Sequence, residues 1–285
     1  MSKFCISTLV YGDEFQRFIP IFTHSINRLW PDVEVKVFIM GELVDDFRDE
    51  CLGDLTIYQN MFPDYPIRES TPNALRFLVP EEHFENNEYV FFTDVDMLFC
   101  ATPRPLCEYY LENIWTDIHS GLRGPLKKPN RPEINGVGWK GKYRRICGGN
   151  FFCSKKWFEL TRKQRKHYRS LLKSDYPDGD EGRPAAAYRE YDEVMLHRIN
   201  FRSGLESPKV KKQFVTGGKI DPIYRGIHIG DFKFPHRVKK MNMLPRHTTY
   251  YRKLRNSQEY QKYYELASRG KFVRDWMAEL DKQAL

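Results

Sequence analysis

Apolar and polar positions along the first hundred residues predict strands and helices in turn. Short β-favouring runs lie at 4–10, 33–40 and 55–58, and the run at 33–40 has the two-residue period of a strand. After the first run, a helix is predicted from Glu14 to Trp30, because its apolar residues recur at helical spacing. These residues are Phe18, Ile21, Phe22, Ile26 and Leu29.

Two more helices and a fourth strand are predicted before residue 100. The helices cover 43–51 and 73–79, the second beginning at Pro72, and the strand covers the apolar run 89–99. Alternating strands and helices are typical of an open α/β sheet. Such sheets bind their ligands at the carboxyl ends of their strands.

The second half of the chain is rich in glycine, proline and basic residues. No regular element is predicted from His119 to Ile146, and an irregular stretch of this length is usually functional or disordered. A basic helix is predicted over 155–172, and one or two amphipathic helices over 250–276. The remaining predictions are a tight turn entering a strand at 148–153, a loop at 175–182 and a short helix at 191–199.

Two carboxylates, Asp94 and Asp96, interrupt the apolar run 89–99. Removing an unpaired carboxylate from water is costly unless a cation or hydrogen bonds compensate. A pair at the end of a core strand therefore favours a divalent cation such as Mg²⁺ or Mn²⁺, which commonly keeps positions open for substrate phosphates. The alternative is a surface turn with two solvated carboxylates, and the apolar residues on both sides favour the metal.

Composition places the chain among globular proteins. Its 285 residues are 41% apolar and 15% aromatic, enough for one large domain or two small ones. No apolar run approaches the about 20 residues that cross a bilayer, and the N-terminus does not resemble a signal peptide. Six cysteines without a Cys-x-x-Cys pair fit a reducing compartment. We therefore expect a cytoplasmic protein.

Charge is divided unequally along the chain. Residues 1–118 carry 8 basic and 21 acidic side chains, whereas residues 119–285 carry 38 and 17. Basic residues are interleaved with aromatic ones, including Trp139, Tyr143 and Tyr263. This part of the chain could bind a membrane surface, with the protein peripheral to it, or a nucleic-acid backbone. A solvated basic surface with core-facing tyrosines is the other interpretation.

Four segments, in order, resemble the GT-A glycosyltransferases, especially the glycogenin and lipopolysaccharide galactosyltransferase group. Residues 73–81 and 89–96 resemble the Arg-containing helix, the Pro-Glu step and the metal-binding strand of that group. Residues 148–157 resemble its F-N-A-G-V segment, and residues 227–233 its H-x-x-G-x-x-K signature, one residue shorter. The resemblance implies a GT-A domain over 1–235, with a Rossmann-like mixed α/β sheet flanked by helices. A basic helical extension over 236–285 would be packed on it.

The resemblance also implies the residues that handle the donor. Asp94, Asp96 and His228 would hold Mn²⁺ or Mg²⁺, while Lys233 contacts a phosphate of the nucleotide sugar and Arg76 lies at the donor site. A structural histidine is the alternative for His228. The ion would neutralise charge on a nucleoside diphosphate leaving group.

Three further positions concern the nucleotide. Thr8 and Tyr11 are the only matches for the family's base-holding residues, and uridine is the family's usual base. Gly230 would let the backbone approach the pyrophosphate closely.

A second acidic pair lies in the segment 190–197. It resembles the H-D-E-S-H-L segment of the blood-group and α-1,3-galactosyltransferase family, in which the Asp holds sugar hydroxyls and the Glu lies beneath the anomeric carbon. Asp192 and Glu193 take these places, and Glu193 falls where the glycogenin group has Gln. An ionised Glu193 could act as nucleophile or stabilise an oxocarbenium-like transition state. A solvated acidic pair at a helix start is the alternative.

The combined expectation is a metal-dependent enzyme that transfers a hexose from a UDP-sugar to a glycan or glycoconjugate, with retention of configuration. Two alternatives stay open. The acceptor could be a modified base in nucleic acid, which would account for the basic half. The chain could also be a non-catalytic protein that binds a nucleotide sugar or a polyanion.

Overall fold

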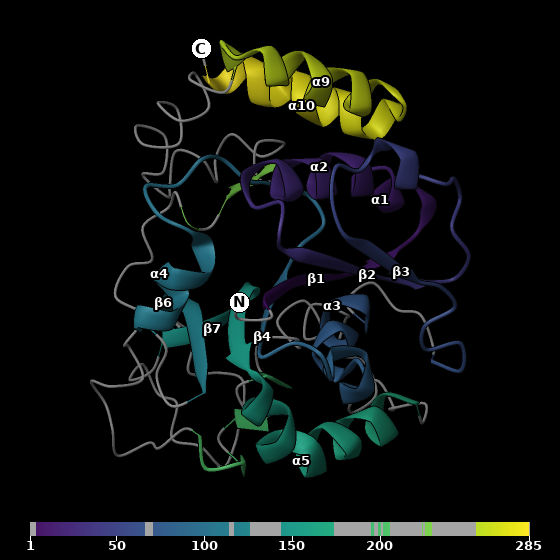
Figure 1. Ribbon diagram of the computed structural model, residues 1–285. Helices are drawn as coiled ribbons and strands as arrows, with labels where there is room; N and C mark the ends of the chain where they lie inside the picture. Colours follow the sequence, from purple (N-terminus) through teal and green to yellow (C-terminus); the bar gives the residue numbers. More distant parts are fainter. Residues whose placement is uncertain are drawn as a thin grey trace. The chain divides into compact units, whose positions relative to one another are not determined.

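The computed structural model describes ten stretches of the chain and divides it into two compact units (Figure 1). The parallel unit comprises Cys5–Met61, Asp94–Tyr109 and Asp221–Leu285, and the antiparallel unit comprises Met1–Phe4, Phe62–Thr93 and Tyr110–Ile220. The described residues are 4–65, 71–113, 117–125, 144–173, 195–196, 199–200, 202–205, 224, 226–229 and 255–284.

Three parallel strands form the centre of the parallel unit. They are β1 (Phe4–Tyr11), β2 (Glu34–Met40) and β3 (Leu55–Tyr58), in the order β3-β2-β1. The predicted strands are confirmed at all three places. Strand β2 is buried on both faces from Val35 to Met40, including Lys36, so its alternating sequence does not mark a solvent-facing side. This is typical of a strand between two parallel neighbours.

The helix predicted from Glu14 is present as two helices. Short α1 (Asp13–Gln16) is followed after two residues by α2 (Ile19–Leu29), whose first turn contains Pro20, and Trp30 caps its end. Proline fits there because the first amides of a helix have no intrahelical partner. Phe18, Phe22 and Ile26 are fully buried, as the helical spacing predicts.

The helix predicted over 43–51 is wrong. Only a 3₁₀ turn, η1 (Arg48–Glu50), forms there. The side chain of Gln16 donates to the carbonyl of Glu42 and accepts from the amide of Val44, and Gln59 accepts from the amide of Leu43. The bond to the carbonyl of Glu42 uses an acceptor that a helix over 43–51 would need. The amides of Leu43 and Val44 would have no intrahelical partner in such a helix, so the side chains of Gln16 and Gln59 fix them in the observed turn.

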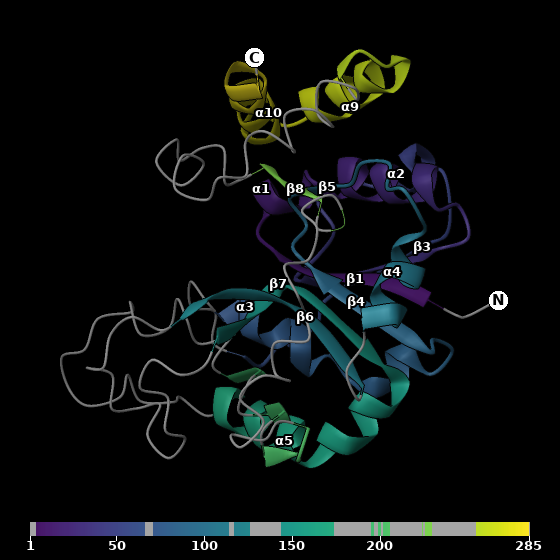
Figure 2. The same ribbon diagram turned by 90° about the vertical axis from the view of Figure 1, so that its left-hand side faces the viewer.

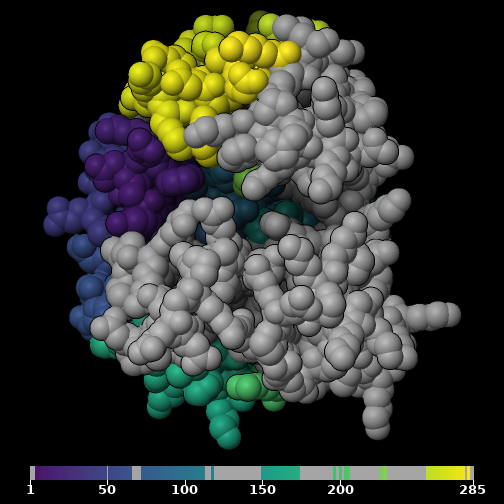
Figure 3. Space-filling view, turned by 180° about the vertical axis from the view of Figure 1, so that it is seen from behind, coloured from purple at the N-terminus to yellow at the C-terminus, as the bar shows by residue number. Residues whose placement is uncertain are grey.

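The C-terminal residues form two helices, α9 (Gln258–Ser268) and α10 (Lys271–Ala284). On α9, Glu259 pairs with Arg28 of α2 at 2.7 Å, and Tyr263 packs edge-on against His24. The ring of Trp276, on α10, lies 5.3 Å from that of Phe18. The yellow C-terminal surface accordingly meets the purple N-terminal surface in Figure 3. Tyr263 is 1% exposed, so this tyrosine faces the core.

Three antiparallel strands form the centre of the antiparallel unit. They are β4 (Tyr89–Thr93), β7 (Arg144–Ser154) and β6 (Ile118–Pro125), in the order β4-β7-β6. Phe92 lies opposite Phe151, and both pack with Trp157 of helix α5 (Lys155–Lys173). The other elements are α3 (Thr71–Leu75), η2 (Arg76–Leu78) and η3 (Glu81–Phe84), while α4 (Leu106–Asn113) crosses the boundary between the units in sequence.

Several element boundaries in this unit differ from those predicted from the sequence. The irregular stretch predicted from 119 to 146 is wrong at both ends, because β6 continues to Pro125 and β7 starts at Arg144. The strand predicted within 148–153 is confirmed, but the tight turn expected before it is wrong, because β7 already runs through those residues. The hydroxyl of Thr93 donates to the carbonyl of Gly149. Residues 126–143 and the loop at 175–182 lie outside the described residues, as does the short helix at 191–199 except for 195–196 and 199.

Parallel and antiparallel strands flanked by helices confirm the predicted α/β class. The domain boundary predicted at 235 stays a prediction. Within the described residues, no helix is long and apolar enough to span a membrane.

Candidate metal centre

A two-stranded ribbon in the parallel unit brings together three side chains of types that can bind a metal ion. Strand β5 (Met97–Leu98) runs antiparallel to β8 (Ile227–His228), with Met97 opposite His228 (Figure 2). The amide of Ile229 donates to the carbonyl of Asp96 at 2.9 Å. This register brings His228 to the Asp-x-Asp segment.

The apolar run 89–99 is two strands rather than one. Strand β4 ends at Thr93, and a turn at Val95 and Asp96 precedes β5. The two aspartates are therefore displayed by a turn, while the residues around them stay buried. The amide of Phe99 donates to the buried hydroxyl of Ser25 on α2 at 3.3 Å, which fixes the end of β5 on that helix.

Gly226 allows β8 to approach β5. Its φ is +76°, a conformation that side chains with a Cβ rarely adopt. A Cβ at this position would lie 3.1 Å from the carbonyl oxygen of Leu98 and 3.3 Å from the ring of Phe99. A side chain here would thus be strained and crowded, and it would disturb the strand that ends in His228.

The ligand atoms of Asp94, Asp96 and His228 all lie within 4.8 Å of one another. The Nε2 atom of His228 is 3.3 Å from Oδ1 of Asp96 and 3.7 Å from Oδ2 of Asp94. The side chain of Asp96 is 9% exposed, whereas those of Asp94 and His228 are 25% and 31% exposed. The group is therefore partly accessible to solvent through Asp94 and His228.

This donor set fits a divalent transition ion. Two carboxylates are the hard ligands that Mg²⁺ and Mn²⁺ prefer, whereas an imidazole nitrogen favours a softer ion than Mg²⁺. Three protein ligands also leave positions for other ligands on a six-coordinate ion. Of the two ions expected from the sequence, Mn²⁺ is the better match.

The residues predicted to hold the nucleotide base, Thr8 and Tyr11, both lie on β1 in the parallel unit. Thr8 is 1% exposed, and its hydroxyl has no hydrogen-bond partner among the described residues. Tyr11 is 41% exposed at the carboxyl end of the strand. Gly12 follows with a φ of +83°. A base contact by either residue stays a prediction.

Arg76 belongs to the antiparallel unit. It begins η2 and is 5% exposed. Its Nε donates to the carbonyl of Asn73 at 3.0 Å, and its guanidinium lies 5.1 Å from the ring of Phe77. The side chain is thus held close to its own turn, and its contact with a donor stays a prediction.

Four predicted site residues lie outside the described residues. They are Asp192, Glu193, Gly230 and Lys233. The nearest described positions after the acidic pair are the buried helical residues Met195 and Leu196.

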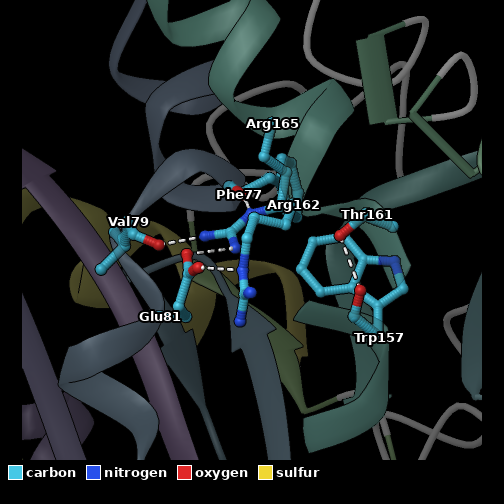
Figure 4. Close-up of polar contacts among 7 residues, drawn as sticks. All are labelled: Phe77, Val79, Glu81, Trp157, Thr161, Arg162 and Arg165. Atoms are coloured by element: carbon cyan, nitrogen blue, oxygen red, sulfur yellow. Dashed lines mark hydrogen bonds and ion pairs between the residues drawn. The ribbon is translucent and has the colours of Figure 1, made fainter. Parts of the chain in front are cut away.

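Sequence reasoning missed Arg165, a buried cation on α5. Its guanidinium is fully buried and contacts Phe77, Val79 and Glu81 (Figure 4). A signal was available, because Arg165 recurs at helical spacing with Trp157, Thr161 and Tyr168 on the buried face of α5. A charge on such a face requires buried partners.

No protein-family model and no curated protein sequence matches this chain. Among solved structures, core-mannan synthase A from Aspergillus fumigatus in its Mn/GDP form is similar with a TM-score of 0.45 and 10% identity, over 70% of each chain. A galactosyltransferase LgtC in complex with donor and acceptor sugar analogs has a TM-score of 0.43 and 14% identity, over 78% of this chain and 82% of that one. Because these TM-scores are below 0.5, the functional proposal rests on the residues of this chain.

Proposed function

We propose that the protein is a metal-dependent glycosyltransferase that takes its sugar from a nucleoside diphosphate donor. The observation that carries the proposal is the meeting of Asp94, Asp96 and His228, which come from two distant segments. A cation bound by all three groups would offset the repulsion between the two carboxylates, and the imidazole nitrogen would add a third ligand. Their order in the sequence, with the four segments that resemble GT-A enzymes, supports the choice of a nucleotide sugar.

The bound ion would neutralise charge on the diphosphate as the sugar departs. Side chains and backbone of the protein would bind the other parts of the donor. Lys233 would contact a phosphate, Arg76 the donor, and Gly230 would allow the backbone to come close. Tyr11, with Thr8, would hold the base, for which we propose uracil.

We propose a hexose as the transferred sugar and retention of its anomeric configuration. Asp192 would hold hydroxyls of the sugar, while Glu193 would face the anomeric carbon as an ionised carboxylate. The acceptor would be a glycan or glycoconjugate. A nucleic-acid acceptor is the second candidate, favoured by the 38 basic side chains of residues 119–285.

The test is a panel of nucleotide sugars incubated with the protein, with and without Mn²⁺, and followed by proton NMR. We expect release or transfer of sugar from a UDP-hexose only when the ion is present, with the product first formed as the retained anomer. An inverted product would make Glu193 a general base and end the retaining proposal. No turnover of any nucleotide sugar, with Mn²⁺ present, would end the enzymatic one.

A further inference from the structure

The backbone amide of Phe99 lies directly after the strand β5, which follows the two aspartates of the candidate metal centre. In an antiparallel pair, hydrogen-bonded positions alternate with positions whose backbone groups point away from the partner strand. The amide of Ile229 donates to the carbonyl of Asp96, so the bonded positions on this side are Asp96 and Leu98. The amide of Phe99 therefore points away from β8. Phe99 is 1% exposed, so this amide needs a partner in the interior.

The hydroxyl of Ser25, on α2, provides a partner for this amide. Its Oγ accepts from the amide of Phe99 at 3.3 Å and donates to the carbonyl of Phe22, one turn earlier in the helix, at 2.9 Å. A hydroxyl has one hydrogen to donate and two lone pairs to accept with. Because the hydrogen is used within α2, the helix fixes the direction of the hydroxyl that receives the strand.

The ring of Phe99 is held at the same place. It lies 6.2 Å from the ring of Phe22, on α2, and 5.8 Å from that of Trp30, which caps the helix. The ribbon of β5 and β8 accordingly lies next to α2 in Figure 2. Aromatic packing holds the side chain of Phe99, whereas the bond to Ser25 also fixes the direction of its backbone.

Packing alone does not explain a serine at position 25. Helix α2 is buried from Ile19 to Asn27, and Ser25 is 0% exposed. Serine is a weaker helix former than alanine, and a buried hydroxyl is costly unless it is hydrogen-bonded. Alanine would fit a buried helix at less cost, so the hydroxyl is better explained by the bond that it accepts from Phe99.

We propose that Ser25 is a positioning residue for the metal centre, acting through β5. This inference rests on the proposed function, which assigns a divalent cation to Asp94, Asp96 and His228. Movement at Phe99 would reach Asp96 three residues earlier, and the pairing of β5 with β8 would carry it to His228. Metal ligands must keep their distances to within about 0.2 Å, so a small movement is enough to weaken binding. All these residues belong to the parallel unit.

Ser7 supplies a matched control. It lies on β1 in the same unit and is 1% exposed, and its Oγ has no hydrogen-bond partner among the described residues. Ser7→Ala removes a buried hydroxyl of the same kind without removing a bond to the ribbon. The comparison separates loss of the bond to Phe99 from loss of a buried hydroxyl in general.

The experiment compares Ser25→Ala, Ser25→Thr and Ser7→Ala with the wild type. Titration calorimetry with MnCl₂ measures the affinity for the ion, at a temperature where every variant is folded. Hydrogen exchange with mass spectrometry, without metal, follows the peptides that cover 96–100. Threonine keeps the hydroxyl and tests rescue. Ser25→Cys, whose thiol is only a weak acceptor, serves if the alanine variant does not fold.

We expect Ser25→Ala to weaken Mn²⁺ binding about fivefold and to exchange faster at 96–100. This is less than the about tenfold or greater loss that follows removal of a group bonded directly to a metal ligand, because Ser25 acts through the backbone. Ser25→Thr and Ser7→Ala should stay within twofold of the wild type.

A purely structural role would lower the unfolding temperature of Ser25→Ala but leave the Mn²⁺ affinity of the folded protein unchanged, and this result would overturn the inference. Equal weakening in Ser25→Ala and Ser25→Thr, or in Ser25→Ala and Ser7→Ala, would overturn it as well. A wild type that binds no Mn²⁺ would instead overturn the proposed function.

Discussion

The Nε2 atom of His228 lies 3.3 Å from Oδ1 of Asp96, although the two residues belong to distant segments of the chain. The pairing of β5 with β8 brings them together, and a backbone hydrogen bond from Ile229 to Asp96 sets the register. A histidine held against two carboxylates forms a candidate ligand set for a cation, and the contribution of His228 to metal binding can be measured directly.

Replacing His228 with Ala should weaken Mn²⁺ binding. One of three protein ligands is lost, while both carboxylates remain to hold the ion. We expect a decrease in affinity of at least about tenfold, which corresponds to about 1.4 kcal/mol. Titration calorimetry of the purified variant with MnCl₂ measures it. His167→Ala is the control, because His167 is exposed on α5, and equal affinities in the two variants would remove His228 from the site.

Replacing Glu81 with Gln should destabilise the protein at neutral pH. Burial acts to raise the pKa of Glu81, but its backbone amide and the cations Arg165 and Arg162 outweigh burial and hold the pKa below the ordinary value. The variant removes the charge that Arg165 faces, and because the Glu81 side chain is 27% exposed we expect a loss of about 1 kcal/mol. Urea unfolding at pH 7 measures the loss.

The pH dependence of this effect has a definite sign. Because the folded-state pKa of Glu81 is lowered, its stabilisation is complete above the ordinary pKa of 4.5 and is lost as pH falls through the lower, folded-state value. The difference between the wild type and Glu81→Gln should therefore shrink below about pH 4.5. Glu82→Gln, at an exposed neighbour, should match the wild type, and a constant difference at all pH values would contradict the ion-pair account.

Replacing His24 with Gln should make the protein less sensitive to mild acid. Burial, and then the charges of Lys262 and Arg28, lower the pKa of His24, which packs against Tyr263 on α9. An unfolded histidine takes up its proton near pH 6.5, whereas the folded one resists it to lower pH. The unfolded state therefore binds more protons below about pH 6.5, and stability falls there by at most about 1.4 kcal/mol per pH unit.

Unfolding midpoints between pH 7.5 and pH 5.5 check this prediction. The wild type should lose more stability over the interval than His24→Gln does. His167→Gln, at an exposed histidine, should keep the wild-type dependence. The account is wrong if His24→Gln and the wild type lose stability equally.

Much of the fold can be predicted from the sequence, because the spacing of apolar residues matches the positions that are buried in the structure. Strands β1 to β3 and helix α5 were predicted near their observed bounds, whereas the C-terminal helices, expected over 250–276, span Gln258–Ser268 and Lys271–Ala284. The helix predicted over 43–51 is wrong because side chains distant in sequence, Gln16 and Gln59, hold the backbone there in another conformation. Local periodicity carries no information about such contacts.

In the candidate site, too, local features could be predicted from the sequence and long-range contacts could not. The carboxylates Asp94 and Asp96 stand out by their position in an apolar run, whereas His228 was chosen only through a resemblance, because pairing of β5 with β8 is a long-range event. Arg165 was not predicted, because α5 contains many basic residues and most of them are exposed. Only the position of Arg165 on the buried face of the helix distinguishes it from the others.

The central claim is that Asp94, Asp96 and His228 hold a divalent cation that in turn binds a nucleoside diphosphate. Titration calorimetry with UDP, in the presence and absence of Mn²⁺, tests it most directly when the wild type is compared with Asp96→Asn and with Asp46→Asn, a control at an exposed carboxylate. The account predicts Mn²⁺-dependent UDP binding in the wild type and in Asp46→Asn, and its loss in Asp96→Asn. UDP binding that is independent of Mn²⁺, or that survives unchanged in Asp96→Asn, would contradict it.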